Sequence, residues 1–358
     1  MGLNKILHTN AGDGETSYAN NSIVQKYGIS KTWPILDETL KNMLDTERFE
    51  EYCCFKMVDF GCASGPNTLL VLSHLMDTLQ DFSSGFQEIQ VFLNDLPDND
   101  FNNLFKLVQS FYQKKETKTK PRCFIYGSPG SFYDRLFPSN SMHFVYSSYS
   151  IHWLSGVPEG LESNNKENIY IAKTSPANVL EAYANQFQRD FFKFLNIRGE
   201  EMIPGGRMVL SLSGRRLEDA SSMVENAHFT ILAETLHEMV VEGQVEKDDL
   251  YSFNVPIYIP CPREVETIIA DQGSFKLDKM DVFPVPWDPS QDENFEKCRC
   301  AKFAADSVRA VIEPMLASHF SRVVNYDVVF EKYAEKLAEH LSKEKPSHFT
   351  IAISLRRK

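Results

Sequence analysis

Met57-Val-Asp-Phe-Gly-Cys-Ala-Ser-Gly-Pro-Asn67 is the most informative run in the chain. An apolar segment ends in Asp59, Gly61 and Gly65 follow, and a helix-like run opens at Asn67. Glycine lets a backbone turn tightly and approach a ligand closely, and the N–H groups at a helix start point at that ligand. The run therefore predicts a strand, a ligand-binding turn and a helix in succession.

A second acid strengthens this interpretation. Asp95 comes directly after the apolar segment Ile89-Gln-Val-Phe-Leu93. Because the carboxyl ends of parallel strands meet at one edge of a sheet, we expect Asp59 and Asp95 to lie side by side, and a carboxylate there can bind a ribose. The alternative is that Asp95 is only a helix N-cap or turn residue. The pair of acids favours a nucleoside-bearing cofactor.

The glycine spacing separates two classes of cofactor. Gly61-x-x-x-Gly65 differs from the Gly-x-Gly-x-x-Gly of NAD-binding turns. A carboxylate before the first glycine suits a cationic ligand better than a pyrophosphate. S-adenosylmethionine carries an ammonium and a sulfonium and no phosphate, so these features favour it over NAD. A non-enzymatic nucleoside-binding protein is a further alternative, against which the intact set of acids and glycines argues.

Alternating periods of apolar residues predict an α/β protein. The expected strands end at Asp59 or cover 89–93, 123–126, 142–146, 207–212 and 349–355. The expected helices cover 34–44, 67–79, 100–111, 177–195 and 328–341. Gly205-Gly206 is expected to separate the fourth helix from the strand that follows. The polar first thirty residues are typical of a loop or lid, and 216–320 is expected to be mainly helices and proline-rich loops, without the same strand rhythm.

Composition limits the function classes. The 358 residues, 42% of them hydrophobic and 24% charged, are typical of a globular protein with one large or two modest domains. A net charge of −12 argues against nucleic-acid or anionic-membrane partners, and no apolar run approaches the ~18 residues of a membrane span. Seven cysteines without zinc-type pairing, and no signal peptide, predict a reducing cytoplasmic compartment.

Four residues are candidates for a substrate pocket: Gln25, Tyr149, His152 and Trp153. Aromatic rings supply flat apolar walls, and the indole N–H and the glutamine amide can donate to a carboxylate. The alternative is that these rings pack the core and that the histidine is structural. The chain has no Ser-His-Asp order, P-loop or metalloprotease motif.

Six ordered blocks resemble the plant SABATH methyltransferases, and the likeness runs from the first residues to the last strand. These blocks are Ser17-Tyr-Ala-Asn-Asn-Ser22 with Gln25, the run at 58–67, Phe92-Leu-Asn-Asp-Leu-Pro97, Gly130-Ser-Phe-Tyr133, Ser147-Ser-Tyr-Ser-Ile-His-Trp-Leu-Ser155 and Ser252-Phe-Asn-Val-Pro256. The stretches at 11–17, 96–105, 157–162 and 248–254 are most similar to members that methylate benzoic acid in floral scent.

The resemblance implies a Rossmann-like seven-stranded methyltransferase sheet with a mainly helical cap, S-adenosylmethionine as cofactor, and a homodimer. It implies a lid at 1–30, a core at 31–214 and 321–358, and a cap at 215–320. Asp95 would hold the ribose, and Ser22 and Asp59 would lie near the methionine end. The other residues implied to bind the cofactor are Tyr18, Gly61, Cys62, Asn67, Leu96, Ser131 and Phe132, of which the last two would flank the adenine.

The resemblance also implies the substrate contacts. Gln25 and Trp153 match the pair that grips the substrate carboxylate, with Tyr149 and His152 along the ring. Relatives that act on salicylate carry methionine where this chain has His152 and Val308. The expected reaction is therefore benzoate to methyl benzoate, with salicylate, cinnamate, anthranilate, nicotinate, jasmonate or N-methylation of a purine alkaloid as alternatives.

The resemblance also bears on whether the protein binds a metal ion. Some relatives have magnesium near the segments that contain Asn165, Phe253 and Asn254. One ligand position that is aspartate in those relatives is Tyr251 here. This departure argues against a functional metal.

Overall fold

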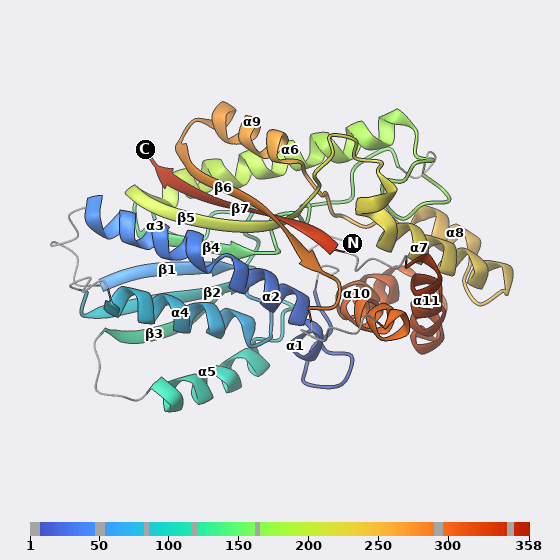
Figure 1. Ribbon diagram of the computed structural model, residues 1–358, viewed down its shortest axis with the longest axis horizontal. Helices are drawn as coiled ribbons and strands as arrows, with labels where there is room; N and C mark the ends of the chain where they lie inside the picture. Colours follow the sequence, from blue (N-terminus) through green and yellow to red (C-terminus); the bar gives the residue numbers. More distant parts are fainter. Residues whose placement is uncertain are drawn as a thin grey trace.

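The computed structural model describes residues 8–46, 54–81, 86–115, 121–161, 165–289, 296–341 and 347–358. Within them seven strands form one sheet in the order β3-β2-β1-β4-β5-β7-β6 (Figure 1). The strands are β1 (Cys54–Phe60), β2 (Glu88–Asp95), β3 (Arg122–Pro129), β4 (Met142–Ser148), β5 (Met202–Gly214), β6 (Phe275–Pro286) and β7 (Ser347–Arg357). The expected seven-stranded α/β sheet is confirmed.

The order of the strands places the acids as expected. β1 pairs in parallel with β2 and with β4, so the carboxyl ends of these strands share one edge. Asp59 is paired with Leu93, two residues before Asp95. β7 runs antiparallel to both β5 and β6 and so joins the edge strand to the parallel part of the sheet.

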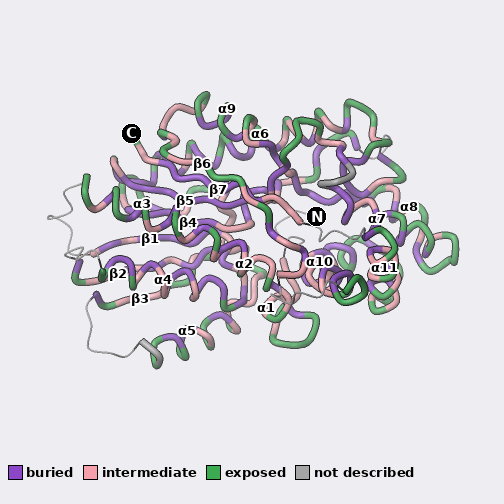
Figure 2. Tube along the Cα trace, viewed as in Figure 1, coloured by how far each residue is buried: buried purple, intermediate pink, exposed green. Residues whose placement is uncertain are grey.

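Helices cover both faces of the sheet. Side chains along a strand alternate between faces, so Phe55 and Met57 enter one core while Val58 and Phe60 enter the other. The first core receives residues from α2 (Ile23–Lys31), α3 (Trp33–Thr46), α4 (Asn67–Asp81) and α5 (Phe101–Lys115). The second receives residues from α6 (Ala177–Glu201) and α9 (Pro262–Gln272). Figure 2 shows the buried strands between the exposed outer turns of these helices.

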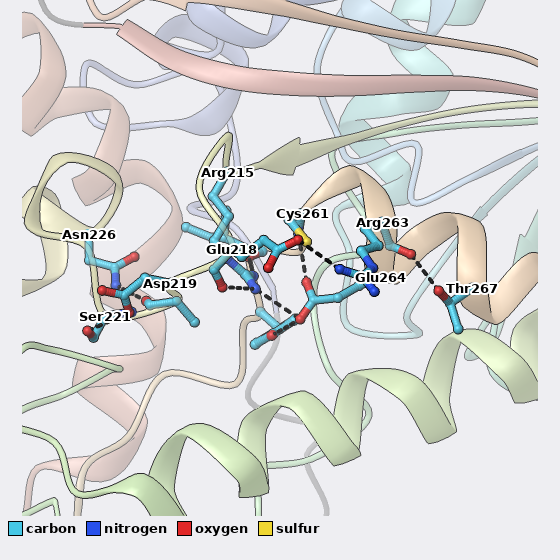
Figure 3. A network of polar contacts seen from close by, with 12 residues as sticks. Arg215, Glu218, Asp219, Ser221, Asn226, Cys261, Arg263, Glu264 and Thr267 are labelled. Atoms are coloured by element: carbon cyan, nitrogen blue, oxygen red, sulfur yellow. Dashed lines mark hydrogen bonds and ion pairs between the residues drawn. The ribbon is translucent and has the colours of Figure 1, made fainter.

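A group of helices stands beyond the carboxyl ends of the parallel strands (Figure 1): α7 (Met223–Val241), α8 (Lys247–Ser252), α10 (Lys297–His319) and α11 (Tyr326–His340). A polar network fixes the connection into this group. Figure 3 shows Arg215, just after β5, reaching Glu264 on α9 at 2.9 Å. The same carboxylate accepts the Cys261 N–H at 2.7 Å. None of the helices in the described ranges has an apolar run long enough to cross a bilayer.

Three expectations about secondary structure were wrong. β6 lies inside 216–320, which was expected to be mainly helical. It was missed because an edge strand with one solvent face carries charges such as Lys279 and Asp281. The first thirty residues include α1 (Tyr18–Asn21) and most of α2. Gly205-Gly206 lies within β5 and does not break the chain before it. The further division into lid, core and cap stays a prediction.

Candidate active site

A cavity of about 460 Å³ opens where the carboxyl ends of the parallel strands meet the helical group. We call the side formed by the loops after β1, β2 and β3 the loop wall; it comprises Gly61, Ala63, Asp95, Leu96, Asn99, Ser131 and Phe132. We call the opposite side the composite wall; it comprises Gln25, Tyr149, His152, Trp153, His228, Trp287, Val308, His348 and Thr350. All the expected carboxylate and ring contacts therefore line one cavity.

Backbone groups hold Asp95 in the loop wall. Its Oδ2 accepts the Ala63 N–H at 2.8 Å and its Oδ1 accepts the Leu96 N–H at 2.8 Å. Burial nevertheless raises the pKa of the Asp95 carboxyl to about 6. Each oxygen keeps acceptor capacity, so this fixed carboxylate can accept hydrogen bonds from a pair of ligand hydroxyls.

The turn after β1 requires glycine at its first position. Gly61 has φ +73°, and a Cβ there would lie 2.1 Å from Ser150 Oγ. The N–H groups of Gly61 and Cys62 both donate to the Asn94 carbonyl at 2.9 Å, which joins this turn to the end of β2. The need for glycine at position 61 is thus explained by Ser150, and a close approach of this backbone to a ligand stays a prediction.

Four residues expected at the cofactor lie behind the lining. Asp59 is buried and accepts the Thr68 hydroxyl at 2.5 Å, and burial raises its pKa to about 7. Asn67 Nδ2 donates to the carbonyl and the hydroxyl of Ser22, each at 3.1 Å. Cys62 is buried. Direct cofactor contacts by these four residues stay a prediction.

The segment before α1 connects the loop after β2 to helix α10. Tyr18 lines the cavity and its N–H donates to the Asn10 carbonyl at 2.9 Å. The Asn10 N–H in turn donates to the Ala310 carbonyl of α10 at 2.8 Å, and the Gly12 N–H donates to Asp100 Oδ2 at 3.1 Å. The segment thus spans from the loop after β2 to the helical group.

Tyr149 occupies the composite wall in a left-handed conformation, with φ +57°. Its hydroxyl hydrogen-bonds to Thr350 Oγ1 of β7 at 2.7 Å, and its N–H donates to the Ser211 carbonyl at 2.7 Å. A Cβ at Gly28 of α2 would lie 1.8 Å from the Tyr149 hydroxyl oxygen. The ring therefore fits only because position 28 is glycine.

His152 and Trp153 follow in the same loop. The Ser213 N–H donates to His152 Nδ1 at 3.2 Å, and burial lowers the pKa of the imidazole to about 3. The ring is therefore neutral with its proton on Nε2. The Trp153 carbonyl accepts the Tyr133 hydroxyl at 2.7 Å, which fixes the backbone that presents the indole to the cavity.

Gln25 comes to the composite wall from α2. Its Oε1 is buried and has no hydrogen-bond partner among the described residues. An amide oxygen only accepts, so a carboxylate cannot be its missing partner; the group of Gln25 that can donate to a carboxylate is Nε2. Val308 joins this wall from α10, as expected.

Sequence reasoning missed several residues of the cavity. Asn99 braces the loop wall by donating to the Ala63 carbonyl at 3.2 Å, and only its place after β2 could have indicated this. His228, Trp287 and His348 come from α7, from the end of β6 and from β7. No local pattern joins these three positions.

Asn165, Phe253 and Asn254, the described residues implied to lie near magnesium, do not form a metal site. Asn165 Oδ1 accepts the Ser175 hydroxyl at 2.8 Å, and Asn254 Oδ1 accepts Asn165 Nδ2 at 2.9 Å. The amide oxygens are thus used to pin two loops together, and Phe253 is buried beside them. In the described ranges no group of three His, Cys, Asp or Glu side chains could hold a metal ion.

Comparisons with a family model, with known sequences and with solved structures all find methyltransferases. A family model described as SAM dependent carboxyl methyltransferase matches residues 4–358. A probable jasmonic acid carboxyl methyltransferase of Theobroma cacao is 42% identical and covers 100% of both chains. A benzoic acid/salicylic acid carboxyl methyltransferase of Petunia hybrida is also 42% identical and covers 99% of each. A solved structure, loganic acid methyltransferase with SAH, matches with a TM-score of 0.84 at 32% identity over 98% of each chain.

Proposed function

Because the chain belongs to the SAM-dependent carboxyl methyltransferases, as its SABATH resemblance implied, we propose that its substrate is a small aromatic acid of the benzoate class. With benzoate, the product would be the volatile ester methyl benzoate. One observation carries this proposal: Gln25 and Trp153 share a cavity wall with the aromatic rings of Tyr149 and His152. The relatives named for jasmonic and for benzoic or salicylic acid are equally identical to the chain, so the acid is inferred from this wall.

The loop wall fits the cofactor. Asp95 would accept the ribose hydroxyls, Ser131 and Phe132 would flank the adenine, and the turn at Gly61 would let backbone approach the methionine part. When bound, S-adenosylmethionine supplies an electrophilic methyl group on a sulfonium. A substrate carboxylate oxygen would form the new bond to that carbon as the carbon–sulfur bond broke, and the electron pair of the carbon–sulfur bond would stay on sulfur in the neutral thioether product.

No proton has to move in this reaction. An aromatic acid is already ionised near neutral pH, since carboxyl pKa values lie at about 4. The work of the protein is to align one oxygen with the methyl group and to exclude water, and such orientation can supply several kcal/mol.

The negative charge of the carboxylate is lost as the ester forms, so an interaction with that charge weakens in the transition state and slows the reaction. Neutral hydrogen-bond donors keep this penalty small. Gln25 and Trp153 are neutral, and burial keeps His152 neutral as well. Lys193 is the one lysine among the described residues that line the cavity, and its Nζ lies 3.3 Å from a carboxylate oxygen of Asp134. The wall thus orients a carboxylate without binding it as an ion pair.

The double variant Gln25→Ala/Trp153→Ala tests the proposal. Turnover with benzoate should fall by at least about 100-fold, as expected when substrate positioning is lost. S-adenosylmethionine binding, measured by calorimetry, should stay within about threefold. The matched control Gln244→Ala changes an exposed glutamine outside the cavity and should behave as the parent. Turnover like that of the parent in the double variant would refute the assignment.

A substrate panel tests the class of acid. Benzoate, salicylate, cinnamate, anthranilate, nicotinate, jasmonate and xanthines are incubated with labelled cofactor, and each ester is identified by mass spectrometry. The proposal expects benzoate-class esters as the main products. Methylation of a xanthine nitrogen, or of jasmonate alone, would overturn it.

Two further expectations are separate from the chemistry. The homodimer implied by the resemblance is tested by light scattering of the purified protein. The cytoplasmic location predicted from cysteine usage is tested by a fluorescent fusion in plant cells. Among the described residues, no two cysteines form a disulfide.

A further inference from the structure

The side chain of Tyr133 crosses from the loop after β3 to the loop after β4. Tyr133 follows Phe132 in the chain, and both residues line the cavity. The Tyr133 hydroxyl donates to the Trp153 carbonyl at 2.7 Å and lies 3.3 Å from the Ile151 carbonyl. Burial raises the pKa of this phenol well above its usual range, so the hydroxyl keeps its proton and remains a donor. Tyr133 therefore joins the loop expected beside the adenine to the backbone of a residue expected at the carboxylate.

Helix α6 holds the loop after β3 through two buried charged side chains. Arg198 donates to the Phe132 carbonyl at 2.8 Å and to the Asp134 carbonyl at 3.0 Å. Glu201 pairs with Arg198 at 2.8 Å, and its other oxygen accepts two backbone N–H groups of the same loop at 2.6 and 2.9 Å. Hydrogen bonds to charged groups are among the strongest in proteins. The backbone on both sides of Tyr133 is therefore fixed to α6.

The same helix also holds the loop after β4. Asp190 of α6 accepts the Ser155 N–H at 2.8 Å with one oxygen and the Ser155 hydroxyl at 2.7 Å with the other. Asp190 is buried, and Ser155 lies two residues after Trp153. One helix thus carries the anchors of both loops, and the Tyr133 hydroxyl connects the two loops directly.

A second contact joins the loop after β4 to the loop wall. The Ser150 hydroxyl lies 3.2 Å from the Gly61 carbonyl, but it is also 3.1 Å from the Ser148 carbonyl and has one proton to donate. The contact of Tyr133 is shorter, and it reaches Trp153 itself. Tyr133 is therefore the better candidate for transmitting the position of one ligand to the group that binds the other.

The spacing of the two loops matters for methyl transfer. The cofactor would bind against the loop after β3, and the Trp153 indole would orient the acid. A displacement of about 1 Å between reacting groups can cost about 100-fold in rate. A hydrogen bond that fixes this spacing would thus act on the rate of the aligned complex more than on the affinity of either ligand.

We propose that Tyr133 is a positioning residue that couples the cofactor loop to Trp153. Through its hydroxyl, an S-adenosyl ligand bound against the loop after β3 fixes the Trp153 backbone and, with it, the indole that orients the acid. This inference rests on the proposed function, in which Phe132 flanks the adenine and Trp153 contacts the carboxylate.

Tyr133→Phe tests the positioning role, because it keeps the ring and removes only the hydroxyl. With benzoate and cofactor both saturating, kcat should fall about fivefold to tenfold, as the loss of one aligning hydrogen bond allows. Calorimetry should show the affinity for S-adenosylmethionine within about threefold of that of the parent. Unchanged kcat would overturn the proposal.

The matched control is Tyr183→Phe. The Tyr183 hydroxyl is buried and donates to the Val255 carbonyl at 3.0 Å, but Tyr183 is not among the described residues that line the cavity. Thermal unfolding should show a similar loss of stability in both variants, while kcat of Tyr183→Phe should stay within about twofold of the parent. Equal losses of kcat in the two variants would assign the effect to stability and overturn the proposal.

Fluorine NMR measures the coupling without acid or turnover. The chain has three tryptophans, so labelling with 5-fluorotryptophan gives three signals, and Trp153→Phe identifies that of Trp153. S-adenosylhomocysteine should shift the Trp153 signal in the parent, and by less than half as much in Tyr133→Phe. Trp33, which stacks on His74 and is not among the cavity residues, serves as the internal reference. No shift in the parent, or shifts of equal size in both proteins, would overturn the proposal.

The two measurements separate this inference from the proposed function. A Trp153 response that is lost in Tyr133→Phe supports the coupling even if no acid is methylated, a result that would refute the proposed function alone. Methyl benzoate formed by Tyr133→Phe at the rate of the parent would refute the positioning role alone.

Discussion

The loop wall and the composite wall face the same cavity but draw on the chain differently. The loop wall takes its residues from three consecutive loops at the ends of β1, β2 and β3, and backbone N–H groups fix its central acid, Asp95. The composite wall collects Gln25, Trp153 and Val308, together with others, from elements far apart in the sequence. Under the proposed function, the cofactor would bind a local surface held by backbone groups, and the acid would bind a surface that depends on tertiary packing.

The largest effect is expected from a substitution that disrupts the composite wall alone. Gly28→Ala places a Cβ where the Tyr149 hydroxyl lies, and that ring is tied to Thr350 and cannot retreat freely. Methyl transfer should fall roughly 100-fold, since overpacking penalties reach about 3 kcal/mol. Steady-state kinetics measure this, and calorimetry should show cofactor affinity within about threefold.

The control is Gly14→Ala, where an added Cβ meets nothing within 4 Å. It should leave turnover near that of the parent. Loss of cofactor binding in Gly28→Ala would show that the two walls are not separable.

The next largest effect is expected from a substitution that disrupts the loop wall alone. Asp95→Asn exchanges a charged acceptor for a neutral amide, and hydrogen bonds to charged groups contribute about 1.5–3 kcal/mol. The dissociation constant of S-adenosylmethionine should rise about 30-fold, while kcat at saturating cofactor should change by less than about threefold. A large fall in kcat with unchanged affinity would contradict the role given to Asp95.

The pH dependence sharpens the contrast. Burial raises the pKa of Asp95 to about 6 and that of Asp59 to about 7, so both ionise between about pH 5 and pH 8. Because the cofactor is cationic, its affinity should rise about tenfold over this interval. The unfolded chain releases the same protons at about pH 4, so the free energy of unfolding of the free protein should fall as pH rises from about 4 to about 7.

Calorimetry and thermal unfolding at pH 5, 6, 7 and 8 measure both trends. The double variant Asp59→Asn/Asp95→Asn should flatten them. His152, with its pKa lowered to about 3, should add no titration of turnover in this range. Affinity that is independent of pH in the parent would contradict the ionisation of the two acids.

The smallest effect loosens one contact of the composite wall. Thr350→Val removes the hydroxyl that bonds Tyr149 while keeping the shape of the side chain. Turnover should fall about fivefold, as a net hydrogen bond is worth about 1 kcal/mol. Thr350→Ser retains the hydroxyl and should restore most of the rate. Equal losses in both variants would assign the effect to packing and not to the hydrogen bond.

The same contrast explains how much could be predicted from sequence. Asp59, Gly61 and Asp95 sit at the ends of apolar runs, so periodicity and glycine placement were enough to predict one sheet edge. Gln25 and Trp153 could be paired only through the family resemblance, because α2 and the loop after β4 meet only in the folded protein.

Other features had no usable local signal. His228 and Trp287 are typical of buried core residues when seen in isolation, and only their contact across α7 and the end of β6 makes them part of the cavity. β6 was missed because an edge strand exposed to water carries charges that resemble a loop. Patterns in the local sequence thus predict most of the loop wall and little of the composite wall.

The position of β7, between β5 and the edge strand β6, has a consequence for folding during synthesis on the ribosome. β7 pairs with β5 on one side and with β6 on the other, and it carries His348 and Thr350. Until residues 347–358 have left the ribosome, both neighbouring strands present open edges, which favour wrong pairing. We expect the nascent chain to be able to form the loops after β1, β2 and β3 early, whereas the composite wall is completed only once β7 has been made.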